Sequence, residues 1–129
     1  MLAASDRLRP VTVDTARGAD QFVRILEALA RVELTDGLSF TDLVLEVAPR
    51  LPRDATVIAI LPSATDEAIW ALGNLRRRGY AVSAVVLEHE DYEYAQAAGR
   101  LLGEGIHSRQ VTDEASLAAL CGSQVLRGV

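Results

Sequence analysis

Two uninterrupted aliphatic segments restrict the possible folds of this chain more than any other feature of its sequence. Residues 55–61 read Ala-Thr-Val-Ile-Ala-Ile-Leu, and residues 80–87 include a nearly continuous run of valine, alanine and leucine. Neither segment alternates between apolar and polar side chains, which is typical of strands that are buried on both faces of a parallel sheet. We therefore expect two neighbouring strands of the same direction, with helices packed on both sides.

Helices and strands are predicted to alternate along the rest of the chain. We expect strands at residues 8–13, 55–61, 80–87 and 106–111, and helices at 19–32, after Ser39, and at 65–78, 91–102 and 115–120, with residues 1–7 loose. Such alternation is typical of right-handed β-α-β crossovers. The sequence predicts an α/β fold: a Rossmann-like three-layer sandwich with a short, mostly parallel sheet of about four strands. Its 129 residues fit a single domain, 1–129.

The predicted helices carry apolar stripes that we expect to form the core. The first helix has five apolar residues at helical spacing: Phe22, Ile25, Leu26, Leu29 and Val32. The third has Ala68, Ile69, Leu72 and Leu75, with Trp70 at the flank, and the fourth has Ala95, Ala98, Leu101 and Leu102. Ser39 and Asp113 are predicted N-caps, and either Ser63 or Thr65 caps the third helix.

Composition excludes several classes of partner. The net charge of −5 disfavours a nucleic acid as partner. No apolar stretch reaches the roughly 18 residues needed to span a bilayer, so no direct membrane contact is expected. The single cysteine, Cys121, rules out an internal disulfide and is interpreted as a buried, inert thiol. These features predict a soluble protein of a reducing compartment, the cytoplasm.

The chain contains no self-sufficient catalytic or cofactor-binding motif. It has no Gly-x-Gly-x-x-Gly after a strand and no lysine for a phosphate-binding loop, so we expect no cofactor. The acidic run Glu88–Asp91 is interpreted as a solvated, helix-capping loop rather than a metal site, because adjacent residues do not all face one point. His107 stands alone on a strand, and Arg76–Arg78 is interpreted as the cationic end of a helix. We predict no metal and no enzymatic activity.

One position could bind a ligand without such a motif. The carboxyl ends of the strands in an open α/β sheet are where ligands bind. Ser63 and Thr65 follow the strand 55–61 and begin a helix, whose N-terminus favours anions. An anion site at Ser63 and Thr65 is therefore one hypothesis, and simple helix capping is the other.

Four segments within residues 18–120 resemble the C-terminal half of domain of unknown function 58, a bacterial family related to von Willebrand factor A domains. They are the helix 22–31, the helix start Phe40-Thr41-Asp42-Leu43, the stretch 51–58 and the passage 75–82. The resemblance implies a Rossmann-like fold. It also implies that the strand bearing the family's metal-binding Asp-x-Ser-x-Ser lies before residue 1, so that the chain is half of a longer domain.

The resemblance bears on metal binding and on partners. Thr41 falls where the family has a metal-ligating threonine, but the later aspartate falls at about Pro62, so the implied metal site is degenerate. The family further implies a MoxR-type AAA+ ATPase as protein partner, and a parent protein that is either cytoplasmic or membrane-anchored. Pairing of two copies into a homodimer is a second expectation, because exposed sheet edges invite it.

Two functional hypotheses follow. The first is a non-catalytic, von Willebrand A-like protein–protein interaction module. The alternative is a small-molecule or anion-binding Rossmann-like domain that uses the helix N-terminus at Ser63–Asp66.

Overall fold

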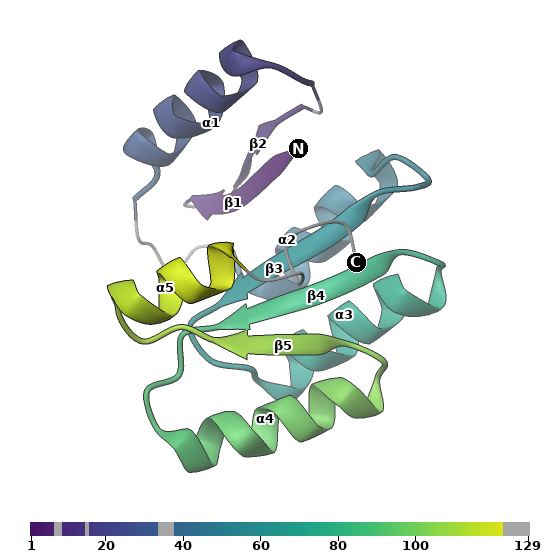
Figure 1. Ribbon diagram of the computed structural model, residues 1–129. Coiled ribbons are helices and arrows are strands. Elements are labelled where there is room, and N and C mark those ends of the chain that lie inside the picture. The colour runs from purple at the N-terminus through teal and green to yellow at the C-terminus, as the bar shows by residue number, and fades with distance from the viewer. Residues whose placement is uncertain (7–8, 15, 34–37, 123–129) are drawn as a thin grey trace. The chain divides into compact units, whose positions relative to one another are not determined.

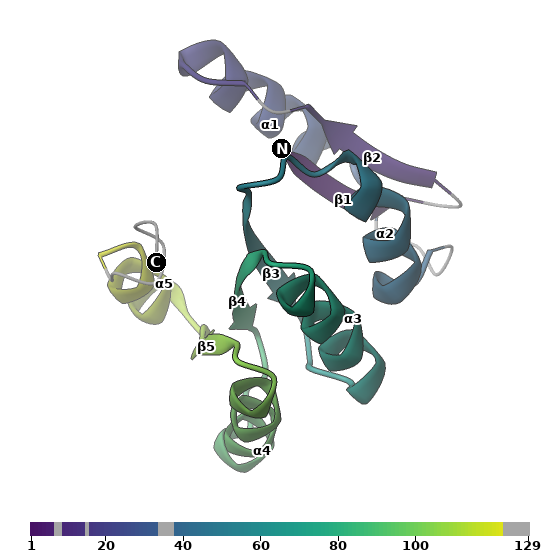
Figure 2. The same ribbon diagram turned by 90° about the vertical axis from the view of Figure 1, so that its right-hand side faces the viewer.

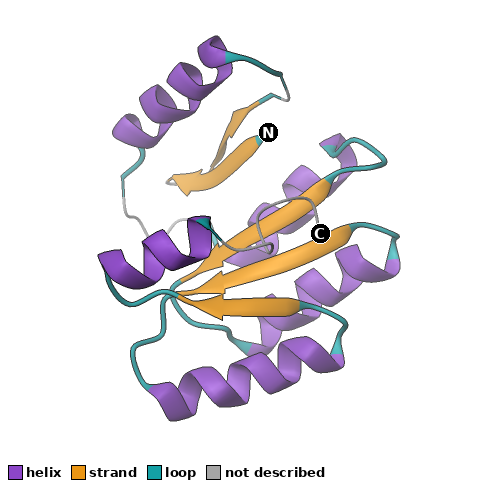
Figure 3. Cartoon of the chain, in the orientation of Figure 1, coloured by secondary structure: helices purple, strands orange, loops and turns teal. Residues whose placement is uncertain are grey.

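The computed structural model describes residues 1–6, 9–14, 16–33 and 38–122 (Figure 1). The chain divides into two compact units, Met1–Leu51 and Pro52–Val129, and each contains its own sheet. Across the described residues there are five α-helices, a two-stranded sheet and a three-stranded sheet (Figure 3). The α/β class predicted from the sequence is confirmed.

The first unit is built on a β-hairpin. Strands β1 (Leu2–Asp6) and β2 (Arg9–Val13) run antiparallel, with Leu2 opposite Val13. The strand predicted at 8–13 is present as β2, but it pairs with β1 and not with the parallel sheet, and residues 2–6, expected to be loose, form β1. Residues 7 and 8 of these two predictions lie outside the described residues. An antiparallel partner can be reached through a very short connection, whereas a parallel one needs a long crossover. The apolar start of the chain supplies that nearby partner.

Two helices and a short 3-10 turn complete the first unit. Helix α1 (Ala19–Arg31) contacts β2, helix α2 (Phe40–Val47) contacts both strands, and η1 (Ala48–Arg50) follows α2 directly. Ser39 caps α2 as predicted, because its hydroxyl accepts a hydrogen bond from the backbone N–H of Asp42 at 3.1 Å. Pro49 lies in η1, where proline cannot continue the α-helical hydrogen-bond ladder.

Helix α1 does not bury the stripe expected to form its core face. Phe22 is 64% exposed, Leu26 49% and Leu29 48%, while Ile25 and Val32 are half-buried. In contrast Gln21 is only 7% exposed, and its Nε2 donates to the backbone oxygen of Asp14 at 2.7 Å. The helix thus turns part of its polar face to the end of β2. Periodicity alone identified the amphipathic helix but could not say which face has a partner.

The second unit contains the parallel sheet. Strands β3 (Thr56–Leu61), β4 (Ala81–Val86) and β5 (His107–Gln110) lie in the order β3-β4-β5, with Thr56 beside Ala81 and Ser83 beside His107. The two aliphatic segments are therefore adjacent and parallel, as predicted. The sheet has three strands among the described residues, rather than about four, because residues 9–13 belong to the hairpin.

Helices flank this sheet in a Rossmann-like arrangement. Helices α3 (Asp66–Arg77) and α4 (Asp91–Gly103) cover one face, and α5 (Glu114–Cys121) lies on the other (Figures 1 and 2). Two successive right-handed crossovers in the order β3-β4-β5 place α3 and α4 on the same side. Gly79 ends α3 with φ +99°, the left-handed conformation that favours glycine after a helix.

The core of the second unit is aliphatic. Its most completely buried large side chains come from strands, helices and a connection alike: Leu61, Leu72, Val86, Leu101 and Ile106. The predicted stripe of α3 is buried throughout, and Trp70 is 55% exposed at its flank. Residues 82–86 of β4 are all buried, as expected for the central strand of a covered sheet.

Strand β3 departs from the prediction of burial on both faces. Ala59 and Leu61 are buried, but Ile58 is 43% exposed and Ile60 67%. Successive side chains of a strand point to opposite faces, so one face of β3 is largely uncovered. β3 is an edge strand of its sheet, and α5 has only eight residues with which to cover this second face.

Two details near the C-terminus also differ from expectation. Helix α4 buries Ala97 and Leu101, whereas the expected Ala95 and Leu102 are exposed. Its rotation places Tyr94 toward the sheet, with its hydroxyl 3.2 Å from Ser108 Oγ on β5. Cys121, expected to be buried, is exposed at the end of α5. Apolar residues occur around much of these two helices, so packing against the rest of the fold decides which of them are buried.

Candidate functional site

The loops that follow the three parallel strands share one edge of the sheet in the second unit. One polar side chain at this edge links two of the loops. Gln110 Nε2 donates to the backbone oxygen of Glu88 at 2.9 Å and to Asp91 Oδ1 at 3.2 Å. These bonds join the loop after β4 to the end of β5. The acidic run 88–91 is thus tied into the fold. The expectation that Asp91 caps the following helix is wrong, because Asp91 is the first residue of α4 and the N-cap, Glu90, makes no side-chain capping hydrogen bond.

The residues of the predicted anion site begin helix α3. Thr65 is the N-cap: its hydroxyl accepts from the backbone N–H of Ala68 at 3.2 Å. Ser63 is exposed two residues earlier. Arg100 forms an ion pair with Asp66 and donates to the backbone oxygen of Ala64 at 3.4 Å. A cation therefore stands beside this helix N-terminus.

Two carboxylates offset that cation. Asp66 and Glu67 both lie in the first turn of α3, where negative side chains already satisfy the positive end of the helix dipole. With Thr65 bonded to Ala68, the N-terminus resembles an ordinary capped helix start. The geometry brings Ser63, Thr65 and Arg100 to one region, but it also supplies that region with its own anions.

Thr41 lies in the first turn of α2, in the first unit, and is half-buried. It is the position that the family resemblance assigns to a degenerate metal site. Within the described part of the chain, no group of three His, Cys, Asp or Glu side chains is arranged to hold a metal ion. His89 and His107 are both exposed. None of these residues is brought together with another to form a metal centre.

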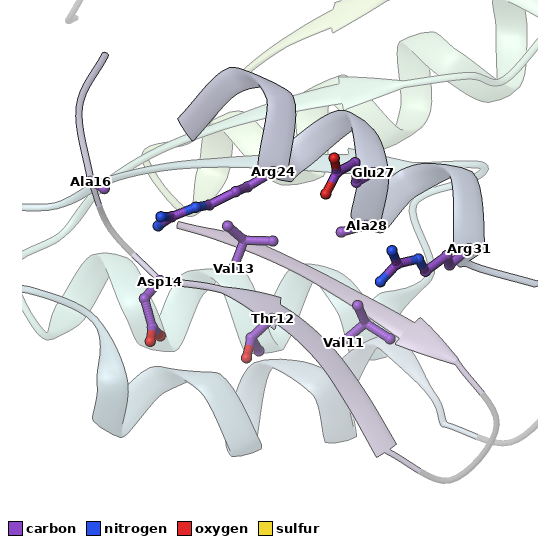
Figure 4. Close-up of a pocket in the computed structure, with 9 residues that line it drawn as sticks. All are labelled: Val11, Thr12, Val13, Asp14, Ala16, Arg24, Glu27, Ala28 and Arg31. Carbon is purple, nitrogen blue, oxygen red and sulfur yellow. The ribbon is translucent and has the colours of Figure 1, made fainter. Parts of the chain in front are cut away.

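The first unit contains a cavity that the sequence did not predict. It lies between β2 and α1, has a volume of about 510 Å³, and is called here the α1–β2 groove (Figure 4). Nine residues line it: Val11, Thr12, Val13, Asp14, Ala16, Arg24, Glu27, Ala28 and Arg31. Val11 and Val13 point from the strand toward the helix and form an apolar floor (Figure 4).

Three charged side chains of α1 border the groove. Arg24, Glu27 and Arg31 occupy positions i, i+3 and i+7, which lie on one face of a helix. The guanidinium groups of Arg24 and Arg31 make no ion pair or hydrogen bond with any described residue. Figure 4 shows the Arg24 side chain near Val13 and the Arg31 side chain near Val11, with Glu27 between them.

The charge of Asp14 is compensated on the other side of the strand. Arg50 of η1 donates to Asp14 Oδ1 at 2.8 Å and to Thr12 Oγ1 at 3.0 Å. Gln21, one turn before Arg24 on α1, fastens the helix to the backbone of Asp14. The Oε1 of Gln21 is buried and has no hydrogen-bond partner within the described residues. The groove thus keeps two uncompensated arginines and one glutamate.

The sequence contains a signal for this groove in the charged face of helix α1. The interval of seven residues between Arg24 and Arg31, with the small Ala28 between, marks one helix face that a strand could approach closely. The predicted core face was instead the apolar stripe, which lies on the other side of the same helix.

The face of α1 that points away from the groove is apolar. Four apolar side chains there are each about half exposed or more: Phe22, Val23, Leu26 and Leu29. Contiguous exposed apolar side chains of this kind are uncommon on monomeric proteins and mark interaction surfaces. We refer to these four residues as the α1 apolar face.

Comparison of the chain with protein-family models, with curated proteins and with solved structures gives no match. The class of the protein therefore follows from its fold: it is an α/β protein with a Rossmann-like, three-stranded parallel sheet flanked by helices. No helix among the described residues is long and apolar enough to cross a membrane.

Proposed function

We propose that this chain is a non-catalytic protein–protein interaction module of von Willebrand A-like type. The observation that carries the proposal is the α1 apolar face. Phe22 and Val23 are 64% and 50% exposed, and Leu26 and Leu29 follow at helical spacing. Covering these side chains removes apolar area from water at about 25 cal/mol per Å², the dominant favourable term in protein association.

The proposed partner is a MoxR-type AAA+ ATPase, as the family resemblance implies, with a second copy of the chain as the other candidate. An amphipathic helix that presents one apolar face is a recurrent recognition element, because its residues at i, i+3, i+4 and i+7 anchor in a partner's groove. Helix α1 offers this spacing at Phe22, Leu26 and Leu29.

The test uses the purified chain in sedimentation velocity, alone and with a purified MoxR-type ATPase. We expect a concentration-dependent complex in at least one of the two experiments. Phe22→Ser combined with Leu26→Ser should weaken it about tenfold or more, because central apolar anchors dominate interface energies. The matched control removes an exposed aromatic and an exposed leucine elsewhere, Tyr92→Ser with Leu102→Ser, which are 71% and 59% exposed.

Either of two results would contradict the proposal. One is a complex that both double variants weaken equally, which would place the contact elsewhere. The other is the absence of any complex, with itself or with the ATPase, over the accessible concentration range.

An anion-binding function at Ser63 and Thr65 is the alternative, and Arg100 beside the α3 N-terminus favours it. A ligand that binds only the folded state raises the midpoint of thermal unfolding. Inorganic phosphate should therefore raise the Tm of the parent chain and not that of Arg100→Gln if this function holds. An unchanged Tm for the parent chain would contradict the alternative.

A further inference from the structure

We propose that the α1–β2 groove binds an extended peptide segment that adds as a strand to the free edge of β2. The segment carries the pattern acidic-x-basic-x-acidic. This inference rests on the proposed function, since it takes the chain as a protein-binding module. It concerns a different face of helix α1, so the two can fail independently.

The open edge of β2 supplies the first argument. β2 pairs with β1 on one side, and no described residue forms a strand on the other. Val11 and Val13 point toward α1, whereas the Thr12 and Asp14 side chains point to the other face of β2, where Arg50 binds them (Figure 4). All four consecutive residues line the groove, so it follows β2 from residue 11 to residue 14. Unpaired N–H and C=O groups on the open edge of β2 are a template for an added strand.

The charges along α1 supply the second argument. Arg24, Glu27 and Arg31 span seven residues, or about 10 Å along the helix axis. Side chains on one face of an added strand recur about every 6.7 Å, so three of them span about 13 Å. The long arginine side chains can bridge the difference of about 3 Å between these two spans. An acidic side chain would then meet Arg24, a basic one Glu27, and a second acidic one Arg31.

The remaining lining argues against other occupants. A wholly apolar peptide would desolvate two guanidinium groups without giving them partners. A nucleic acid would meet Glu27 in the groove and a chain with a net charge of −5. The volume of about 510 Å³ falls in the range of pockets that hold small ligands, which suits a few residues of a peptide.

The test uses fluorescence anisotropy with a labelled peptide, acetyl-Thr-Glu-Thr-Lys-Thr-Glu-Thr-amide, and the complete chain. The charge pattern reads the same in both directions, so parallel and antiparallel addition are both sampled. We expect it to bind about tenfold or more tightly than the charge-swapped peptide, in which lysine and glutamate are exchanged. Equal binding of the two peptides would overturn the proposal.

Variants of the chain assign the binding to the groove. Arg24→Glu with Arg31→Glu should weaken the first peptide about tenfold or more, while Arg78→Glu with Arg109→Glu should not. Both control arginines are exposed in the second unit and change the net charge by the same amount. The triple variant Arg24→Glu, Glu27→Arg, Arg31→Glu should prefer the charge-swapped peptide. A gain of binding of this kind cannot come from a misfolded chain.

Two further probes separate strand addition from simple charge pairing. In one peptide the three charged residues carry N-methyl groups, and in the other the threonines do. An added strand bonds through one edge only, so one of the two should lose binding and the other should keep it. Equal effects, or competition by a simple dicarboxylate such as adipate at the same concentration, would overturn strand addition.

Peptide binding in the groove should not depend on the α1 apolar face. Phe22→Ser with Leu26→Ser should leave the peptide affinity unchanged. A chain that forms no complex with protein partners but binds the peptide would contradict only the proposed function. Loss of peptide binding in this variant would overturn the assignment to the groove.

Discussion

Arg77 donates a hydrogen bond to Glu104 at 2.8 Å, and this ion pair joins the C-terminal ends of α3 and α4 beside the buried Gly73. A Cβ atom on Gly73 would lie 2.5 Å from Glu104 Oε2. Glycine at this position thus leaves the space that the carboxylate occupies. The two side chains are 55% and 35% exposed, so solvent screens their attraction.

The first prediction concerns Gly73→Ala. The carboxylate is the flexible end of a long side chain and can move, which forfeits a surface ion pair worth about 0–1 kcal/mol. Alanine in place of glycine inside a helix gains about 1 kcal/mol. We expect a net change in unfolding free energy within about 1 kcal/mol of zero.

Urea unfolding followed by Trp70, the only tryptophan, measures the stability of the second unit. Glu104→Gln should cost less than about 1 kcal/mol in the parent chain and close to nothing in Gly73→Ala, where the pair is already broken. A loss above about 2 kcal/mol for Gly73→Ala alone would contradict this reading of the contact.

The second prediction tests the rotation of α4 with two adjacent leucines. Leu101 is fully buried, whereas Leu102 is 59% exposed. Leu101→Ala should destabilise the second unit by about 2–5 kcal/mol, because it removes buried methyl groups and leaves a cavity. Leu102→Ala should cost less than about 1 kcal/mol. Urea midpoints by Trp70 fluorescence compare them directly, and equal losses would mean that α4 is rotated differently.

The third prediction decides which residue caps α3. Thr65→Ala removes the acceptor for the backbone N–H of Ala68 and should cost about 1 kcal/mol. Ser63→Ala removes an exposed hydroxyl that lies outside the cap and should stay within about 0.5 kcal/mol of the parent. The same urea experiment reports both. A larger loss for Ser63 than for Thr65 would reverse the assignment.

The fourth prediction concerns pH and the capping box of α5. The backbone N–H of Ser116, and then its hydroxyl, bond to Asp113 and lower the pKa of that carboxyl below its ordinary value. A group whose pKa is lower when folded stabilises the fold above its unfolded pKa. It loses that stabilisation as the pH falls through the folded pKa. The cap of α5 should therefore weaken only in acid.

Carbon-13 NMR of the Asp113 carboxyl, titrated through the acid range, measures this shift. Ser116→Ala removes the side-chain bond and should raise the pKa of Asp113 toward its ordinary value, while the backbone bond persists. The parent chain, titrated under the same conditions, is the control. A pKa of Asp113 unaffected by the substitution would show that the hydroxyl contributes nothing.

Part of the candidate site could be predicted from the sequence. The position of Thr65 at the start of a helix after a buried strand was predictable, because N-capping and aliphatic runs are local signals. The α1–β2 groove was not, since it depends on the pairing of residues 9–13 with residues 2–6. The local sequence of a five-residue strand does not indicate which other strand it pairs with.

The sequence by itself determined the two parallel aliphatic strands, the helix between them and the N-caps Ser39 and Asp113, because these follow from periodicity and from hydrogen bonds between near neighbours. Only the tertiary structure decided which side chains are covered. Ile60 on β3 and Phe22 on α1 read as core residues, yet they are 67% and 64% exposed. Burial requires a partner surface. Hydrophobic patterning identifies the apolar face of a helix or strand, but it does not show whether another surface covers that face.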